Sequence, residues 1–249
     1  MSIIIAILLG IVQGLTEFLP VSSSGHLVLF EKLFGISEGN LAFNIVVHLG
    51  SLLAVIICYR KTLFDMVKKP FDKKTYLLIV ATIPTVIIFF LFRDFFEDSF
   101  SGAYLGVCFL VTSVMLIFCS IFMRGGESQK IDYKTAIVMG LFQGFAIVPG
   151  VSRSGSTLTG GLCMGADRKE VADFSFLMSI PVILGSLVLE IISGGFADAQ
   201  ILPLVFGFVF SFLSGLLSIK FMLKLVKSKS LYPFAIYLVI VSILTFVLL

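Results

Sequence analysis

The feature that most constrains this chain is a series of long, uninterrupted apolar runs, such as 79–92 and 231–249. Continuous runs favour helices, because the strands of a membrane barrel alternate apolar and polar residues. Hydrophobic residues make up 58% of the chain and charged residues 13%, whereas soluble domains have about 45–50% and about 25%. A water-soluble protein of this size could not cover its surface with so few charges. The sequence therefore predicts an all-α polytopic membrane protein, since helices satisfy their own backbone groups in lipid.

Six stretches are long enough to cross a bilayer as helices, at about 20 residues each. They are 42–59, 75–92, 101–123, 171–192, 201–226 and 231–249. Two further apolar stretches, 3–12 and 136–148, are too short, and each runs into a proline and a Ser/Gly cluster. A helix of about 13 residues reaches only about 20 Å, against a hydrocarbon core of about 30 Å. We therefore expect six transmembrane helices plus two re-entrant half-helix pairs, whose second half-helices open at Gly25 and Gly155.

Basic residues gather in four places along the chain, and this clustering predicts the orientation. The clusters are Arg60, Lys61, Lys68, Lys69, Lys73 and Lys74; Arg124, Lys130 and Lys134; Arg168 and Lys169; and Lys220, Lys224, Lys227 and Lys229. The intervening loops carry the acidic residues Glu31, Glu38, Asp94, Glu97, Asp98 and Asp198. Because basic loops stay in the cytoplasm, we expect the acidic loops and both termini outside. The assignment requires both short stretches to be re-entrant, since a full crossing would place later basic loops on the wrong side.

The two short stretches are also copies of each other. Residues 6–25 and 136–155 align without a gap at an offset of 130 and are identical at nine of twenty positions. Each copy precedes three predicted spans, and the copies enter from opposite faces. We therefore interpret 1–249 as a single membrane domain built from an inverted-topology repeat, with repeats at about 1–124 and 131–249. Such repeats place broken helices and the substrate site at the midplane.

Polar side chains crowd both breaks, where irregular backbone must be buried or line a water-filled cavity. They are Gln13, Glu17, Ser22, Ser23, Ser24 and His26 in the first copy, and Gln143, Ser152, Arg153, Ser154, Ser156 and Thr157 in the second. Each Ser/Gly cluster opens a half-helix, and the free N–H groups of a helix N-terminus favour anions. An arginine adds a planar fork that matches phosphate oxygens. The sequence therefore predicts a phosphate or diphosphate ligand held inside the membrane.

A purely structural role is the alternative for each of these residues. Glu17 and Arg153 could form an intramembrane ion pair that locks the repeats together, and the serines could serve close packing alone. Ser23 and Arg153 are the positions at which the two Val-Ser-x-Ser-Gly strings differ, which favours a specialised role for both. His26 directly follows the serine cluster and is favoured as functional. His48 stands alone in an apolar run, and we interpret it as structural.

Two strings resemble the motifs of a known family. QGLTEFLPVSSSGH at 13–26 resembles the E/Q-x-x-x-E motif and serine-rich extension of the undecaprenyl-diphosphate phosphatases, the bacitracin-resistance protein family. PGVSRSGST at 149–157 matches that family's P-G-x-S-R-S-x-x-T motif at every fixed position. The resemblance covers nearly the whole chain. It implies a phosphatase of the bacterial cell membrane that converts undecaprenyl diphosphate to the monophosphate and recycles the lipid carrier of peptidoglycan synthesis, with bacitracin competing for the substrate.

The resemblance also implies roles for individual residues. The predicted catalytic residues are Glu17, Ser23, His26 and Arg153. The predicted substrate-binding residues, which also follow from the helix-terminus argument, are Ser22, Ser24, Gly25, Ser152, Ser154 and Thr157. Gln13 and Glu17 would hold a divalent cation, Mg²⁺ or Ca²⁺, as oxygen ligands, although Gln13 weakens any scheme that needs two carboxylates here. The nucleophile is either Ser23 activated by His26, or a water activated by His26 or Glu17.

Two other classes of protein share parts of this pattern. Type-2 phosphatidic acid phosphatases need a His six residues after the Arg and an Asp four residues later, and this chain has Thr159 and Cys163 there. A transporter or flippase for a lipid headgroup also fits an inverted repeat with broken helices. We expect no nucleic-acid partner, and a homodimer is compatible with the sequence. The site is expected to open to the outer face, because the half-span that carries Glu17 and His26 enters from that side.

Overall fold

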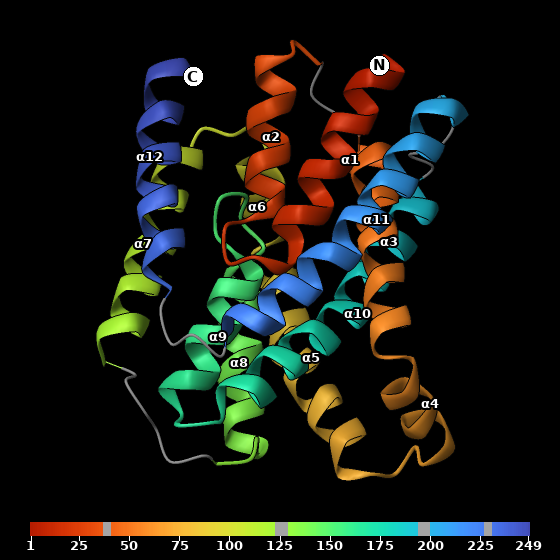
Figure 1. Ribbon diagram of the computed structural model, residues 1–249, viewed down its shortest axis with the longest axis vertical. Helices are drawn as coiled ribbons and strands as arrows, with labels where there is room; N and C mark the ends of the chain where they lie inside the picture. The colour runs from red at the N-terminus through yellow and green to blue at the C-terminus, as the bar shows by residue number, and fades with distance from the viewer. Residues whose placement is uncertain (37–40, 123–128, 194–199, 227–230) are drawn as a thin grey trace.

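The computed structural model describes residues 1–36, 41–122, 129–193, 200–226 and 231–249, and it confirms the all-helical prediction (Figure 1). The helices of these residues are α1 Ile3–Phe18, α2 Ser23–Leu33, α3 Leu41–Cys58, α4 Arg60–Lys68, α5 Lys73–Leu91, α6 Arg93–Ser99, α7 Leu105–Phe122, α8 Tyr133–Phe145, α9 Arg153–Cys163, α10 Arg168–Ser193, α11 Ile201–Val226 and α12 Tyr232–Leu248. Five charged residues used for the predicted orientation lie outside the described residues: Glu38, Arg124, Asp198, Lys227 and Lys229.

Within these residues, fewer helices meet the length and hydropathy criteria for a span than the six expected. α5, α10 and α11 are long and apolar enough to cross a membrane, and α3 with α4 forms one bent pair that passes together. The stretches 101–123 and 231–249 instead yield shorter apolar helices, because the chain turns at Gly102, where φ is +79°, and α12 begins only at Tyr232. The coarser prediction of a multi-pass membrane protein is confirmed.

The half-helices differ in detail from the apolar stretches that predicted them. α1 continues beyond the stretch 3–12 through Gln13 and Glu17 to Phe18, so these two residues share a helix face, as their spacing of four residues predicts. α2 and α9 begin two residues before Gly25 and Gly155. In each case a serine hydroxyl accepts a hydrogen bond from the glycine N–H, at 3.3 Å for Ser22 and 3.0 Å for Ser152. Each serine is therefore an N-cap, which places the glycine at the third helical position.

The two short helix pairs approach the interior from opposite ends of the molecule. Both chain termini lie at one end, where α1 starts and α2 finishes (Figure 1). α8 starts and α9 finishes near the opposite end, which also holds α4. In each pair the chain reverses direction in the interior, between Phe18 and Ser23 and between Phe145 and Arg153.

The first helix of each pair packs closely on a long helix from the other half of the chain. A side-chain carbon added at Gly10 would lie 2.5 Å from the carbonyl oxygen of Gly207 on α11. One added at Gly140 would lie 2.1 Å from the carbonyl oxygen of Ala81 on α5. Gly14 and Gly144, four residues on, meet the same two helices. Small residues at this spacing let membrane helices approach closely, so the two halves are interlocked along α1–α11 and α8–α5.

The outer surface is strongly apolar. Large hydrophobic side chains are exposed along α5, α7 and α12, among them Leu91 at 71%, Val114 at 63% and Val247 at 76%. Polar side chains such as Gln13, Thr112 and Ser175 are instead fully buried. This distribution suits a lipid environment, since it places the polar groups inside and the apolar groups outside. The buried polar groups gather where the two helix pairs reverse direction.

Candidate active site

The two reversals of the chain are in direct contact, as expected for the two Ser/Gly clusters. A side-chain carbon added at Gly25 would lie 2.7 Å from the backbone of Gly150. The N–H of Gly150 donates to the Ser22 hydroxyl at 3.1 Å, and the Ser154 hydroxyl donates to the Leu19 carbonyl at 2.8 Å. The serine hydroxyls therefore bind the opposite turn as well as their own. These contacts bring residues about 130 positions apart into one polar centre.

Glu17 is the hub of that centre. Its side chain is 5% exposed, and its Oε1 forms an ion pair with Nη2 of Arg153 from α9. Its Oε2 accepts hydrogen bonds from the Ser23 hydroxyl and from Nε2 of Gln13, the latter at 2.9 Å. An intramembrane carboxylate is costly unless it is paired and hydrogen-bonded, and Glu17 is both. The contact between Glu17 and Arg153 is the ion pair that the sequence offered as the structural alternative.

Arg153 is held on its far side by α10. Its Nη1 donates to the carbonyl oxygen of Ser175 at 3.3 Å. The Ser175 hydroxyl lies 2.6 Å from the hydroxyl of Thr157, which also donates to the Arg153 carbonyl at 2.9 Å. Thr157, predicted to bind substrate, thus contacts the backbone of Arg153 and the side chain of Ser175. Nη2 of the guanidinium therefore faces Glu17, and Nη1 faces α10.

His26 lies near the serines but faces a different helix. Its Nδ1 is 2.7 Å from the Ser22 carbonyl oxygen, and its Nε2 is 2.7 Å from the hydroxyl of Tyr237 on α12. Because a carbonyl can only accept, Nδ1 carries the hydrogen, and Nε2 accepts from Tyr237. The imidazole also stacks on the Tyr237 ring, with centroids 5.6 Å apart, and meets Phe109 edge-on. The hydrogen bond recorded for the Ser23 hydroxyl is to Glu17 and not to His26.

Two residues of α3, His48 and Ser51, complete the surroundings of Glu17. The sequence analysis predicted no functional role for either. Nε2 of His48 is 3.7 Å from Oε2 of Glu17, and the Ser51 hydroxyl is 3.5 Å from Nε2 of Gln13. His48 also approaches the Asn44 carbonyl at 2.6 Å through Nδ1. Their spacing of three residues, with Asn44 four residues before His48, puts these polar groups on one face of α3, which is the signal that could have identified them. Tyr237 had no such signal, being an isolated tyrosine in an apolar run.

The remaining predicted site residues have mixed surroundings. The hydroxyl of Ser152 caps its own helix and lies 3.2 Å from that of Ser154. The backbone N–H of Ser152 donates to Thr112 of α7, which in turn donates to the Gly150 carbonyl. Ser24 is partly exposed. Gly25 allows the two turns to touch, since any side chain there would collide with Gly150.

The oxygen ligands available for a cation are few among the described residues. They contain no group of three or more His, Cys, Asp or Glu side chains placed to hold a metal ion. Oε1 of Gln13 is buried and has no hydrogen-bond donor, so it is the one oxygen of the predicted pair that could accept a new partner directly. Both Glu17 oxygens already contact other groups. The donor set is therefore too small for a cage made of protein groups alone.

The fold and this centre define an all-helical, multi-pass membrane protein in which a buried acid and a half-buried arginine meet between two broken helices. The chain belongs to the family of the bacitracin resistance protein BacA, whose model matches residues 6–244. It is similar to a protein named undecaprenyl-diphosphatase from Carboxydothermus hydrogenoformans, with 42% identity over 98% of this chain and 96% of that protein. A protein of the same name from Methanosphaera stadtmanae is 39% identical over 100% and 98%. One named undecaprenyl-diphosphatase 4, from Bacillus cereus, is 42% identical over 93% and 92%. The resemblance seen in the two motifs is confirmed.

Proposed function

We propose that this chain is an undecaprenyl-diphosphatase, which hydrolyses undecaprenyl diphosphate to undecaprenyl phosphate and phosphate. Membership of the BacA family and the names of its relatives support this activity. The observation that carries the proposal is the contact of Glu17 with both Ser23 and Arg153. The Ser23 hydroxyl is hydrogen-bonded to the Glu17 carboxylate, which also pairs with Arg153. The three side chains can therefore supply a nucleophile, a base and an anion-binding group within one site.

The proposed role of Arg153 is to bind the diphosphate. Glu17 neutralises its guanidinium, and the phosphate oxygens of the substrate would compete for the same N–H groups. Ser152 and Thr157 lie on the same helix, whose N-terminus favours a negative charge. Phosphoryl transfer depends mainly on positioning and on neutralising the phosphate oxygens, so these groups would supply most of the catalysis.

The proposed nucleophile is Ser23, with Glu17 as its base. The Ser23 hydroxyl would pass its proton to Glu17 while its oxygen bonds to the terminal phosphorus, and the bond from that phosphorus to the bridging oxygen breaks. Undecaprenyl phosphate leaves with the bridging oxygen, and water then hydrolyses the phosphoserine. In the alternative, a water activated by Glu17 or His26 attacks directly. Trapping a phosphoserine at Ser23 would support the first route, and full activity of Ser23→Ala would exclude it.

A divalent cation, Mg²⁺ or Ca²⁺, is proposed to bind between the protein and the substrate. The residues fit only in part, since Gln13 would supply its free amide oxygen and Glu17 a carboxylate oxygen once Arg153 turns to the phosphate. The phosphate oxygens of the substrate would have to complete the ligand set, as is common for Mg²⁺. When bound, such an ion would neutralise charge on the diphosphate. Phosphate release after dialysis against EDTA, with and without added Mg²⁺ or Ca²⁺, tests this requirement.

The proposed architecture is one domain, 1–249, formed by inverted repeats at about 1–124 and 131–249. Six spans would surround two re-entrant pairs, α1–α2 and α8–α9. The packing of Gly10 on α11 and of Gly140 on α5 supports the two repeats, because the first helix of each repeat packs on a long helix of the other repeat. The basic starts of α4, α5, α8 and α10 lie away from the termini (Figure 1). This supports both termini outside and a site open to the outer face of the cell membrane.

Two experiments test these proposals. Purified protein in detergent should release phosphate from undecaprenyl diphosphate, and bacitracin should lower the rate by sequestering the lipid; a pure lipid transporter would release none.

For the topology, a cysteine-free variant receives a single cysteine at Lys130 or at Glu38, which lies outside the described residues. An impermeant thiol reagent on intact cells should label the site at Glu38 and not the site at Lys130. The reverse pattern would show that the orientation is inverted.

A further inference from the structure

α4 runs across the end of the molecule and not along its length. It follows α3 after a single residue, Tyr59, and the two helices are bent by 76° at that break. The Tyr59 hydroxyl donates to Asp173 of α10 at 2.6 Å, which ties the bend to a neighbouring helix. Because α3 is part of a candidate span, a helix nearly perpendicular to it lies along the membrane surface.

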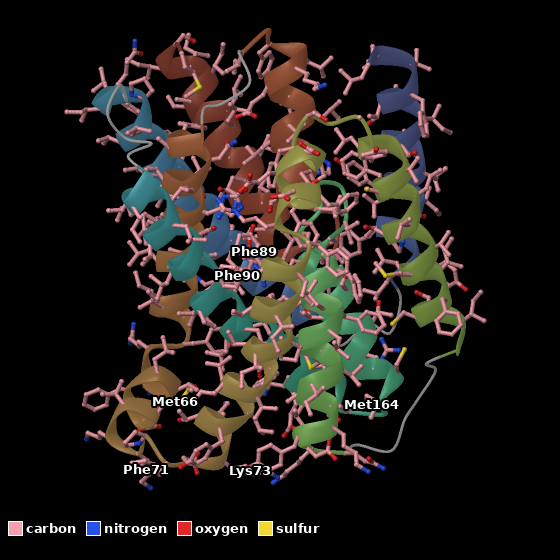
Figure 2. All side chains as sticks on the ribbon, turned by 180° about the vertical axis from the view of Figure 1, so that it is seen from behind. Met66, Phe71, Lys73, Phe89, Phe90 and Met164 are labelled. Atoms are coloured by element: carbon pink, nitrogen blue, oxygen red, sulfur yellow. The ribbon has the colours of Figure 1, made fainter. Side chains whose placement is uncertain are left out.

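Three large apolar side chains form an exposed stripe along α4 and the turn that follows it. Phe64 and Val67 on α4 are 59% and 78% exposed, and Phe71, in the turn after the helix ends at Lys68, is 82% exposed. No residue of α4 is buried. Figure 2 shows Phe71 at the outer edge of this end of the molecule, with Lys73 beside it. α5 begins at Lys73, directly after this turn, and it also exposes apolar side chains such as Ile79 and Ile83, each at 51%.

Basic side chains surround the stripe. Residues 60–74 hold six basic side chains and two acidic ones, a net charge of +4. Within the described residues, none of the recorded ion pairs uses these six bases. The Lys68 ammonium instead lies over the face of the Phe64 ring, 4.4 Å from its centroid, so this cation is in direct contact with the apolar stripe. A helix with apolar anchors and unpaired cations at a membrane surface complements anionic headgroups.

We propose that α4 and the following turn, residues 60–74, form a binding surface for anionic phospholipids of the adjoining leaflet. Phe64, Val67 and Phe71 insert between the headgroups, and the surrounding bases contact lipid phosphates. A membrane is favoured over a protein partner because the chain runs from this turn directly into α5, a candidate span whose exposed side chains are apolar. Each base near an anionic membrane surface strengthens the attraction to that surface by roughly fivefold in the binding constant.

The chain contains no tryptophan, so Phe71→Trp introduces a single fluorescent reporter. The full-length variant is reconstituted in vesicles that contain the same mole fraction of either phosphatidylglycerol or phosphatidylcholine, both with identically brominated acyl chains. We expect brominated phosphatidylglycerol to quench the fluorescence at least about twice as strongly, because it gathers around the bases. Adding Lys68→Gln and Lys69→Gln, or raising the salt to about 1 M, should reduce this ratio toward one.

Val247→Trp is the matched control. Val247 is 76% exposed on α12, at the end of the molecule opposite α4, and residues 232–249 carry no charged side chain. Both brominated lipids should quench this reporter equally. Equal quenching of Phe71→Trp by the two lipids would overturn the proposal, and so would the absence of quenching by either, which would assign the stripe to a protein partner. The readout does not involve phosphate release, so the result is independent of the proposed enzyme activity.

Discussion

The helix pairs α1–α2 and α8–α9 share a frame and differ at the positions that carry chemistry. Both have two glycines on the first helix and a serine N-cap on the second. At an offset of 130, Glu17 of the first pair corresponds to Ile147 of the second, and Ser23 to Arg153. The first pair therefore supplies the acid and the hydroxyl, and the second supplies the cation. The two copies of the motif thus contribute opposite charges to one polar centre.

The two reversals also differ in their backbone. Ser22 has φ +69°, and among the described residues it is the only residue other than glycine with a positive φ. Its counterpart Ser152 has φ −74°, and in the second copy Gly150 takes the left-handed conformation instead, with φ +95°. A left-handed serine costs about 1–3 kcal/mol, and such strain persists only when surrounding contacts enforce it. Here those contacts are the bonds of Ser22 to Gly25 and Gly150.

The largest expected effect comes from changing the cation of the second pair. Arg153→Lys keeps the charge that balances Glu17 but loses the fork that binds two phosphate oxygens. We expect a folded protein whose turnover falls by about a hundredfold or more, corresponding to roughly 3–4 kcal/mol of transition-state stabilisation. Arg153→Ala should be inactive and also less stable, since it leaves Glu17 buried and unpaired. Phosphate release and melting temperature are measured on the same preparation. Turnover of Arg153→Lys near that of the wild type would show that the residue is structural.

The same substitution in both pairs should give unequal results. Gly25→Ala places a methyl group 2.7 Å from the Gly150 backbone, which cannot move aside without separating the two turns. We expect it to lower the free energy of unfolding by about 1–3 kcal/mol. In Gly155→Ala the nearest atoms are side-chain atoms of Ser152 and Pro20, at 3.2 and 3.3 Å, so the loss should be smaller. Thermal unfolding in detergent compares the two variants, and equal losses would contradict the assigned contact between the turns.

A smaller effect is expected from changing Tyr237, the hydrogen-bond partner of His26. In the second pair, Ser156 stands at the position that corresponds to His26. Tyr237→Phe retains the stacked ring and removes the hydroxyl that donates to Nε2. We expect about a tenfold loss of turnover, comparable to one hydrogen bond.

Histidine labelling reports on this contact directly. The chain has only two histidines, so ¹⁵N labelling of histidine gives few signals. The Nε2 resonance of His26 should move in Tyr237→Phe, while the signals of His48 stay in place. An unmoved Nε2 resonance would mean that the hydroxyl does not hold the ring.

The smallest effect concerns the caps of the two first helices. Asp132 caps α8, and Ser2 caps α1 at the corresponding position. Hydrogen bonds from the backbone and the hydroxyl of Thr135 lower the pKa of the exposed Asp132 carboxyl. A lowered folded-state pKa contributes stability that is present above the unfolded-state value, about 4, and is lost as the pH falls through the folded-state value.

Asp132→Ser should therefore remove a small pH-dependent contribution to the melting temperature, about 1–2 °C between pH 7 and pH 3. Ser2→Ala is the control, because its cap does not titrate and its effect should be the same at both pH values. A pH dependence unchanged by Asp132→Ser would mean that the cap contributes nothing measurable.

Much of this protein could be predicted from local properties of the chain. Long apolar runs require helices in lipid, so the all-helical class follows from hydropathy alone. The copy of 6–25 at 136–155 identifies the two breaks, and the cap serines and glycines appear in it as identical letters. Glu17 and Arg153 were recognisable because ionisable residues inside apolar stretches are costly and are retained for a reason. The six-span topology and the residue roles stay predictions.

Tertiary structure decided which of these groups touch. The pairing of Ser23 with Glu17, the orientation of His26 toward Tyr237 and the approach of His48 to Glu17 all join separate helices or a reversal of the chain. Helical periodicity indicates which face a residue occupies, but it does not specify which distant helix covers that face. That choice depends on packing along the whole length of the helices, through contacts such as Gly10 on Gly207 and Gly140 on Ala81. Hydropathy and the repeated motif predict the helical class and the polar groups at the two breaks. How those groups combine depends on the packing of the two halves, because hydrogen bonds require distances that no local pattern encodes.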